Sequence, residues 1–294
     1  MRSHIFHSLL ATALTLALSA PSLANPSAAT VAAVAPKDLL LVIRAADDDA
    51  THDAAARLLA AAEAGNSFAM YDIGSLHRQS RREHAAEFAY DPGKALQWLT
   101  RAFDDGRLTA AYKIALTYAS LGDDMEAMGW AQLYSHYLRP SEQKSGKPQQ
   151  LRLALLNDLY ARVGRDREDA IKARLMALLD KHGAKFEESR KQDEPRHPDW
   201  IAEANGCKRT RRPKGESVQV RVEGHTLIEY LVEIEPNGQV GDFAALDSAP
   251  SAMHERDLRP LVHRIACQPG NGAARYTFNV LELRGTRTLA LSKD

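Results

Sequence analysis

The spacing of apolar residues changes once along this chain, and that change restricts the fold more than any other feature. Between residues 45 and 186 apolar side chains recur at three- and four-residue spacing, which places them on one face of successive α-helices. After Ser217 the spacing becomes two, because Val218, Val220 and Val222 alternate with polar residues. Period two is typical of strands with one buried face. The sequence therefore predicts an α+β fold with two independent cores, a helical layer followed by an antiparallel sheet with one helix.

The helical region repeats itself at an offset of 41 residues. Residues 69–77 align with residues 110–118, and a glycine precedes each stretch, at Gly65 and at Gly106. A unit of helix, turn, helix and glycine that recurs at such a period is typical of a solenoid. The residues predicted to form the repeat core are Ala69, Ile73, Gly74, Ala95, Trp98, Ala102, Gly106, Ala110, Ile114, Tyr118 and Trp130.

The large aromatic residues of this region have two interpretations. Trp98, Tyr112, Tyr118 and Trp130 are spaced as core residues that seal stacked helices, and aromatics at helical spacing mostly bury area. A ligand-binding role is the alternative. Packing is the simpler interpretation, because two or three repeats are near the minimum for stability and need these side chains in the core.

These residues resemble a known family of helical repeats. The pattern Ala-x-x-x-Leu-Gly-x-x-Tyr, followed by Asp-x-x-Lys-Ala-x-x-Trp-x-x-x-Ala-x-x-x-Gly, is similar to Sel-one-like repeats, which are relatives of the tetratricopeptide repeat. One copy spans residues 69–106, with His77 in place of the usual tyrosine and a longer turn over residues 78–90. A degenerate copy covers residues 110–137. The resemblance implies a protein-interaction scaffold rather than an enzyme.

The C-terminal region has the pattern of a hairpin, a helix and a closing strand. Residues 228–234 alternate, and Asn237-Gly238 after Pro236 predicts a tight hairpin turn, since this dipeptide readily adopts positive φ. A partner strand at 239–246, a helix at 253–266 and a long strand at 275–283 follow. The last strand is the candidate edge strand, with Tyr276, Phe278 and Val280 on one face.

This order resembles the C-terminal domain of TonB. The strand and turn at residues 231–240 match, as do the helix at 258–264 and the closing strand at 276–280. The segment that leaves the helix departs from the pattern, because Ile265 and Cys267 stand where that family usually carries Trp and Phe. The resemblance implies a free strand edge that pairs with a partner protein by β-augmentation.

The chain has two cysteines, Cys207 and Cys267. In an oxidising compartment such a pair is usually a structural disulfide, and closing a loop of this size removes about 4 kcal/mol of unfolded-state entropy in the chain-entropy model. A metal site is disfavoured because histidines at zinc spacing are missing. A thiol–imidazole pair of Cys267 with His263 is the remaining alternative.

The first residues have the layout of a secretory signal peptide. Arg2 lies in a short positive region, residues 9–18 are apolar, and the small residues Ser22 and Ala24 precede a cleavage site before Asn25. A permanent anchor would need ~20 apolar residues to cross the bilayer. We therefore expect export to the periplasm and no stable membrane span after cleavage.

Formal charge excludes one class of partner. The 38 Lys and Arg residues balance the 38 Asp and Glu residues, so no global field favours nucleic acid. The basic run Lys208–Lys214 either is solvated or contacts an anionic surface. The predicted organisation is a signal peptide at 1–24, a linker at 25–44, a helical repeat domain at 45–186, a charged linker at 187–214 and a TonB-like domain at 215–294.

These observations predict a periplasmic interaction protein that binds periplasmic or outer-membrane proteins through the solenoid face and the sheet edge. A TonB-type energy transducer and an enzyme with an undetected site are the alternatives. The sequence contains no Gly-x-Ser-x-Gly elbow, phosphate-binding glycine loop or His-Glu-x-x-His helix. We therefore predict no catalytic, cofactor-binding or metal-ligating residue.

Overall fold

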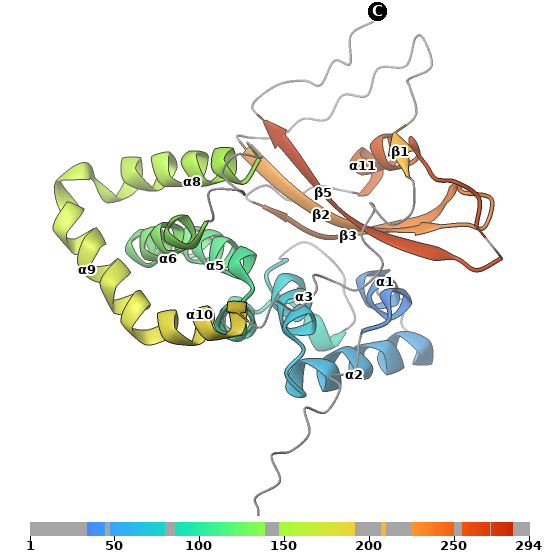
Figure 1. The fold of residues 1–294 in the computed structure, drawn as a ribbon, viewed down its shortest axis with the longest axis horizontal. Helices are drawn as coiled ribbons and strands as arrows, with labels where there is room; N and C mark the ends of the chain where they lie inside the picture. Colours follow the sequence, from blue (N-terminus) through green and yellow to red (C-terminus); the bar gives the residue numbers. More distant parts are fainter. Residues whose placement is uncertain are drawn as a thin grey trace, which may run out of the picture. The chain divides into compact units, whose positions relative to one another are not determined.

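Helices precede a small sheet along the chain, as Figure 1 shows. The computed structural model describes residues 34–44, 48–79, 86–138, 147–191, 207–209, 225–249, 255–270 and 272–284. The predicted signal peptide at 1–24 and the predicted strand at 218–222 lie outside these ranges. The α+β class predicted from the sequence is confirmed.

The helical part is a series of α-helices. Their bounds are α1 Pro36–Arg44, α2 Asp49–Glu63, α3 Ser67–His77, α4 Pro92–Asp104, α5 Leu108–Ser120, α6 Asp124–Tyr137, α8 Lys147–Val163, α9 Glu168–Leu178 and α10 Ala184–Lys191. Short 3₁₀ turns lie at Ala86–Phe88 and Arg165–Arg167, and a π-helical turn at Leu179–Gly183 joins α9 to α10.

The repeat explains how two successive helical hairpins pack alike. Helices α3 and α4 form one hairpin, and α5 and α6 form the next. Gly65 and Gly106 adopt φ values of 98° and 91° where α2 and α4 end. A Cβ atom at Gly74 would lie 2.6 Å from Leu99 Cγ, so the close approach of α3 and α4 requires glycine.

The predicted linker at 25–44 is wrong for its last nine residues. Residues 36–44 form α1, which buries Leu39, Leu40, Val42 and Ile43 against the neighbouring helices. The apolar run of this segment is short, so its spacing alone does not distinguish a helix from a linker. The helix is recognised only when the helices that it packs against are known. The predicted charged linker at 187–214 likewise overlaps the end of α10.

The sheet has three main strands in the order β3-β2-β5, all antiparallel. Strand β2 spans His225–Ile234, β3 Val240–Ala249 and β5 Arg275–Arg284, with α11 at Glu255–Val262 between β3 and β5. The short strands β1 (Lys208–Arg209) and β4 (Ile265–Ala266) pair separately. The predicted order of hairpin, helix and closing strand is therefore present.

The hairpin turn is held by the segment that follows α11. Gly238 has a φ of 88°, and its carbonyl accepts a hydrogen bond of 2.8 Å from the Cys267 backbone N–H. A Cβ atom at Gly238 would collide with the Cys267 carbonyl oxygen. Cys267 is also bonded to Cys207, which confirms the predicted disulfide and ties the entry of the module to its turn.

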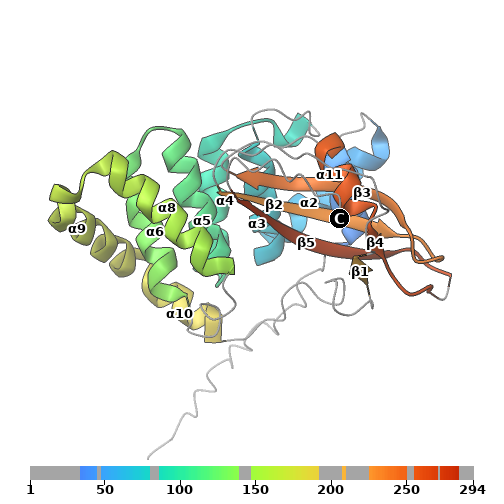
Figure 2. The ribbon, with the colours of Figure 1, turned by 90° about the horizontal axis from the view of Figure 1, so that it is seen from above.

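The sheet buries both faces, so the expectation of two independent cores is wrong. One face packs under α11, with Ile228, Tyr230 and Val232 in the same apolar cluster as α11. On the other face, Leu231, Ala244 and Leu246 belong to the hydrophobic cluster of the helices. Strand β3 contacts α1 and α3, and β2 contacts α8; Figure 2 shows the sheet beside the helices. Residues 31–294 accordingly form one compact unit.

Candidate functional site

The contact between helices and sheet contains a cluster of buried charges centred on Lys113. This lysine lies in the middle of α5, and 1% of it is exposed. Its ammonium group lies 2.5 Å from Ser75 Oγ on α3, forms an ion pair with Glu229 on β2 and lies 3.0 Å from Asp247 Oδ2 on β3. Three oxygens from three elements therefore surround the ammonium group, and the two ion pairs offset its charge.

Tyr71 joins the same cluster from α3. Its hydroxyl donates a hydrogen bond of 2.7 Å to Glu229 Oε1, and its ring centroid lies 4.1 Å from Lys113 Nζ. Burial, together with the negative charge of Glu229, raises the pKa of Tyr71 well above its usual value. Tyr71 therefore acts as a neutral donor that gives Glu229 Oε1 a hydrogen bond away from water.

Asp247 receives further donors from the end of α3. Arg78 Nη1 lies 3.3 Å from Asp247 Oδ1, and the Gln79 side-chain amide donates to the same oxygen. Asp247 is 2% exposed and Glu229 is 5% exposed, so water screens these pairs poorly. Among the described residues, the two strand carboxylates are thus held by groups from α3, from the two residues that follow it and from α5.

A third carboxylate, Asp72, lies in the same region without hydrogen bonds. It is fully buried, and neither of its oxygens has a hydrogen-bond partner among the described residues. Desolvation raises the pKa of Asp72 to about 7, although the positive charges of Arg107 and Lys113 oppose the rise. The negative charge of Glu229 adds to it.

The repeat places Asp72 and Lys113 at equivalent positions, because they are separated by the repeat offset of 41 residues. Each lies inside an otherwise apolar stretch of its helix, and this is the signal that the sequence analysis missed. Glu229 belongs to the alternating stretch at residues 228–234, on the side of the strand opposite Ile228 and Tyr230. That side is also buried, against the helices, and Glu229 forms its ion pair with Lys113 there.

The chemistry of the cluster favours docking over reaction. A hydroxyl beside an amine is found in some nucleophilic sites, but Lys113 forms ion pairs with Glu229 and Asp247, and the Ser75 hydroxyl donates to the Tyr71 carbonyl oxygen at 2.7 Å. Ser75 is also fully buried. Within the described ranges no three His, Cys, Asp or Glu side chains gather as metal ligands would.

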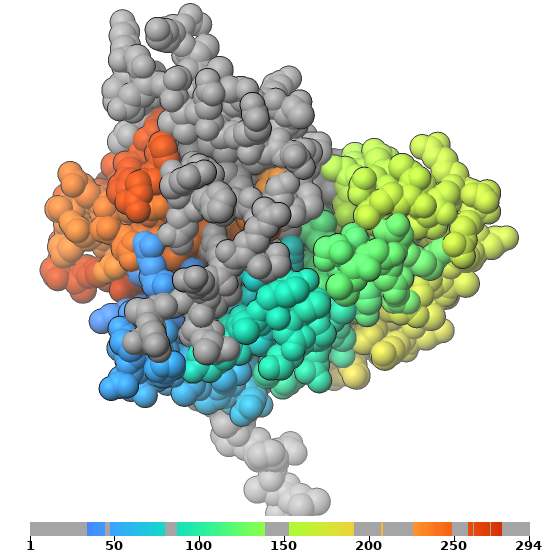
Figure 3. Space-filling view, turned by 180° about the vertical axis from the view of Figure 1, so that it is seen from behind, coloured from blue at the N-terminus to red at the C-terminus, as the bar shows by residue number. Residues whose placement is uncertain are grey.

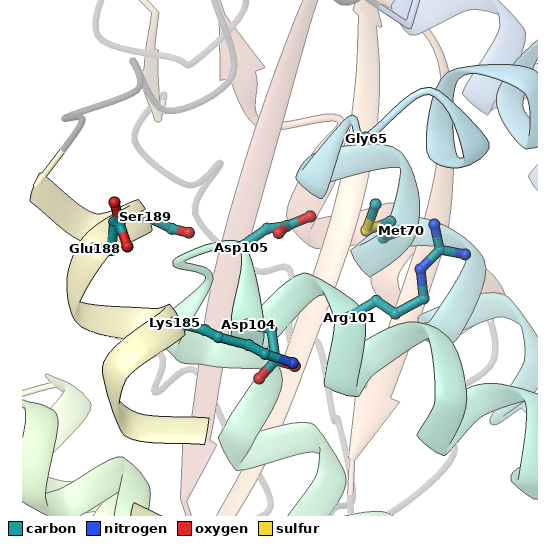
Figure 4. Close-up of a pocket in the computed structure, with 8 residues that line it drawn as sticks. All are labelled: Gly65, Met70, Arg101, Asp104, Asp105, Lys185, Glu188 and Ser189. Atoms are coloured by element: carbon teal, nitrogen blue, oxygen red, sulfur yellow. The ribbon is translucent and has the colours of Figure 1, made fainter. Parts of the chain in front are cut away.

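A second candidate is an open hollow of about 540 Å³ beside α10. Figure 4 shows Lys185 directed at Asp104, whose carboxylate accepts from Lys185 Nζ at 3.4 Å and pairs with His182 Nδ1 at 2.7 Å. These contacts join the C-terminal end of α4 to α10. Both signs of charge line the hollow, which gives it no marked preference for one ion. Its lining residues are Gly65, Met70, Arg101, Asp104, Asp105, Lys185, Glu188 and Ser189.

The residues predicted from sequence lie mostly in the helical core. Trp130 is buried, with its ring 5.5 Å from that of Phe103, whereas Trp98 is half-buried and stacks under Arg101 at 4.4 Å. The fully buried members of the predicted repeat core are Ala69, Ile73, Ala95, Ala102, Ala110 and Ile114. The candidate edge residues Tyr276, Phe278 and Val280 pair with Glu233, Leu231 and Glu229 of β2.

Comparison with known proteins gives limited similarity. No family model matches the chain, and no curated protein matches it in sequence. One solved structure that is similar is c5321, a protective antigen present in uropathogenic Escherichia coli strains, which displays an SLR fold. The match has 14% sequence identity and a TM-score of 0.38, and it covers 56% of this chain. The chain spans about a third of that protein, since 33% of its length is covered.

Proposed function

We propose that this protein is an exported scaffold that binds partner proteins by strand addition to β5. The observation that carries the proposal is the ladder between β2 and β5. It runs through ten consecutive residue pairs, from His225 with Arg284 to Ile234 with Arg275, without a register shift. Among the described residues β5 pairs with β2 alone, so its other side offers a regular row of backbone groups to an extended segment.

The opposite edge strand, β3, is a poorer template. Its pairing with β2 shifts register twice, after Glu229 and after Glu233. Such irregularities twist an edge and interrupt pairing with another chain. Strand β3 also contacts α1, α3 and α11, and Arg44 of α1 lies 3.1 Å from Asp242. The unbulged edge is therefore the one suited to a partner.

The helices have a different role from the one expected. Helices α3 and α5 supply the donors that hold the sheet, so this part of the predicted solenoid binding face is occupied by the chain's own strands. In Figure 3, which shows the molecule from behind, the surfaces of α1 and α2 in blue lie beside those of the sheet in orange. Under this proposal the helical layer is a rigid support for the edge strand.

Export to the periplasm and kinship with TonB belong to the same proposal. The order of hairpin, helix and closing strand, with β2 in the centre, supports the likeness to the TonB C-terminal domain. In the described part of the chain, every helix is too short or too polar to cross a bilayer. A measured mass of the mature protein decides between a cleaved scaffold and a tethered energy transducer, because only the transducer would retain residues 1–24.

Proline substitution in β5 tests strand addition. Successive backbone N–H groups of an antiparallel strand point alternately toward and away from its neighbour, so one of Asn279→Pro and Val280→Pro removes an outward donor and the other a donor to β2. Photocrosslinkers at successive positions of β5 should capture a partner with a period of two. We expect one proline variant to lose that crosslink while keeping wild-type stability.

The matched control places the crosslinker at Lys172, which is exposed on α9. Capture of the same protein from Lys172 and from β5 with equal yield would contradict strand addition. So would full retention of the β5 crosslink in both proline variants.

A further inference from the structure

We propose that Asp72 links the docking of the sheet on the helices to pH, so that uptake of one proton by its carboxyl group tightens the contact and loss of that proton loosens it. This inference goes beyond the proposed function, because it concerns how the support for β5 is held rather than what β5 binds. It rests first on the arrangement of charges in the interface.

Charged and titratable groups of α3, α5, β2 and β3 lie near Asp72 or in the Lys113 cluster beside it. Three carboxylates, those of Asp72, Glu229 and Asp247, share one region with the ammonium of Lys113. The charged and titratable groups of the interface are Tyr71 of α3, Arg78 just after α3, Arg107 just before α5, Lys113 of α5, Glu229 of β2 and Asp247 of β3.

The ammonium group of Lys113 is directed at other partners. It donates to Ser75 and forms ion pairs with Glu229 and Asp247, and no described residue donates to either oxygen of Asp72. An ionised carboxylate buried without hydrogen bonds is strongly disfavoured, whereas the protonated acid carries no net charge. Docking of the sheet brings the negative charge of Glu229 near Asp72, and this charge further favours the protonated form of Asp72.

The pKa of Asp72, which burial raises to about 7, agrees with this arrangement. In the unfolded chain the carboxyl returns toward 3.8, so folding and docking together take up a proton between these two pH values. The stabilisation is complete below the lower value and is lost as pH rises toward about 7. Above that pH the contribution is constant, because both states are then ionised.

A histidine on the same helix changes stability with pH in the opposite direction, so its effect can be distinguished from that of Asp72. His77 lies on α3, and burial lowers its pKa below the usual value. A histidine that is neutral when folded destabilises the folded state as pH falls. Any loosening that grows with rising pH therefore has the sign of Asp72 and not of His77.

Hydrogen exchange on the full chain tests the proposal with Asp72→Asn, which mimics the protonated acid. Exchange of β2 and β3, corrected for the chemical rate, is compared at pH 5 and pH 8. We expect wild-type protection, relative to the variant, to fall by up to about tenfold per pH unit below pH 7. The matched control is Asp53→Asn, at an exposed carboxylate of α2, whose protection should follow the wild type.

Parallel protection curves for the wild type and Asp72→Asn would overturn the proposal. Infrared spectra of the wild-type protein labelled at aspartate provide a second test, which holds even if the variant fails to fold. A buried aspartic acid signal that disappears between pH 6 and pH 8 is expected. Its absence at pH 5 would equally refute the proton-linked contact.

Discussion

The two faces of the C-terminal sheet are held by different physics. The face under α11 is apolar, with Tyr230 and Phe243 packed among aliphatic residues. The face against the helices combines apolar residues with the charged cluster around Lys113. Apolar contacts are non-directional and tolerate changes of shape, whereas buried ion pairs require matched partners. The difference suggests that the helical side determines where the sheet sits and the α11 side mainly adds burial.

The largest expected effect follows from removing the central cation. Lys113→Met conserves volume but leaves Glu229 and Asp247 buried without their ammonium partner. Breaking a buried pair on one side typically lowers stability by about 3–5 kcal/mol. Denaturant unfolding measures the loss, with Lys94→Met as a control at an exposed lysine of α4.

A triple variant sharpens this first prediction. Replacing Lys113, Glu229 and Asp247 together by apolar residues of similar volume removes the charges as well as their desolvation. Because Arg78 then loses its Asp247 partner and Tyr71 its Glu229 acceptor, we expect the triple variant to recover only part of the lost stability. If the triple variant were less stable than Lys113→Met, the charged cluster would contribute net stability to the fold beyond balancing its own charges.

On the apolar face the expected effect is smaller and depends on volume. Leu258 of α11 is fully buried, and Leu258→Ala should lower stability by about 2–5 kcal/mol through lost burial and a cavity. Leu258→Met conserves volume and should lower it by less than about 1.5 kcal/mol. Equal losses for Leu258→Met and Lys113→Met would remove the contrast between the two faces.

The contrast also explains what the sequence could predict. The change of period, the offset of 41 residues and the Asn237-Gly238 turn are local patterns, and each corresponds to an element of the structure. The charged interface joins residues more than a hundred positions apart, such as Tyr71 and Glu229. Alternation alone indicates which side of a strand is polar, but a polar side faces either water or opposite charge. Only the partner helix decides between these outcomes.

A third prediction concerns the neutral member of the cluster. Tyr71→Phe deletes the hydroxyl that donates to Glu229 while keeping the ring beside Lys113. Hydrogen bonds to charged groups contribute about 1.5–3 kcal/mol, so a loss of this size is expected. A double-mutant cycle with Glu229→Gln isolates the pair. If the losses of stability of the two single variants simply add in the double variant, the effect of Tyr71 does not come from its hydrogen bond to Glu229.

The smallest expected effect lies away from both faces and sets the baseline for the comparison. Asn66 caps α3, because its Oδ1 accepts hydrogen bonds of 3.0 Å from the backbone N–H groups of Phe68 and Ala69. Asn66→Ala should lower stability by about 1 kcal/mol, and Asn66→Ser should preserve most of it. Because the amide does not titrate, the loss should be the same at pH 5 and pH 8. A loss as large as that of Lys113→Met would mean that the start of α3, rather than its buried charges, governs the docking of the sheet.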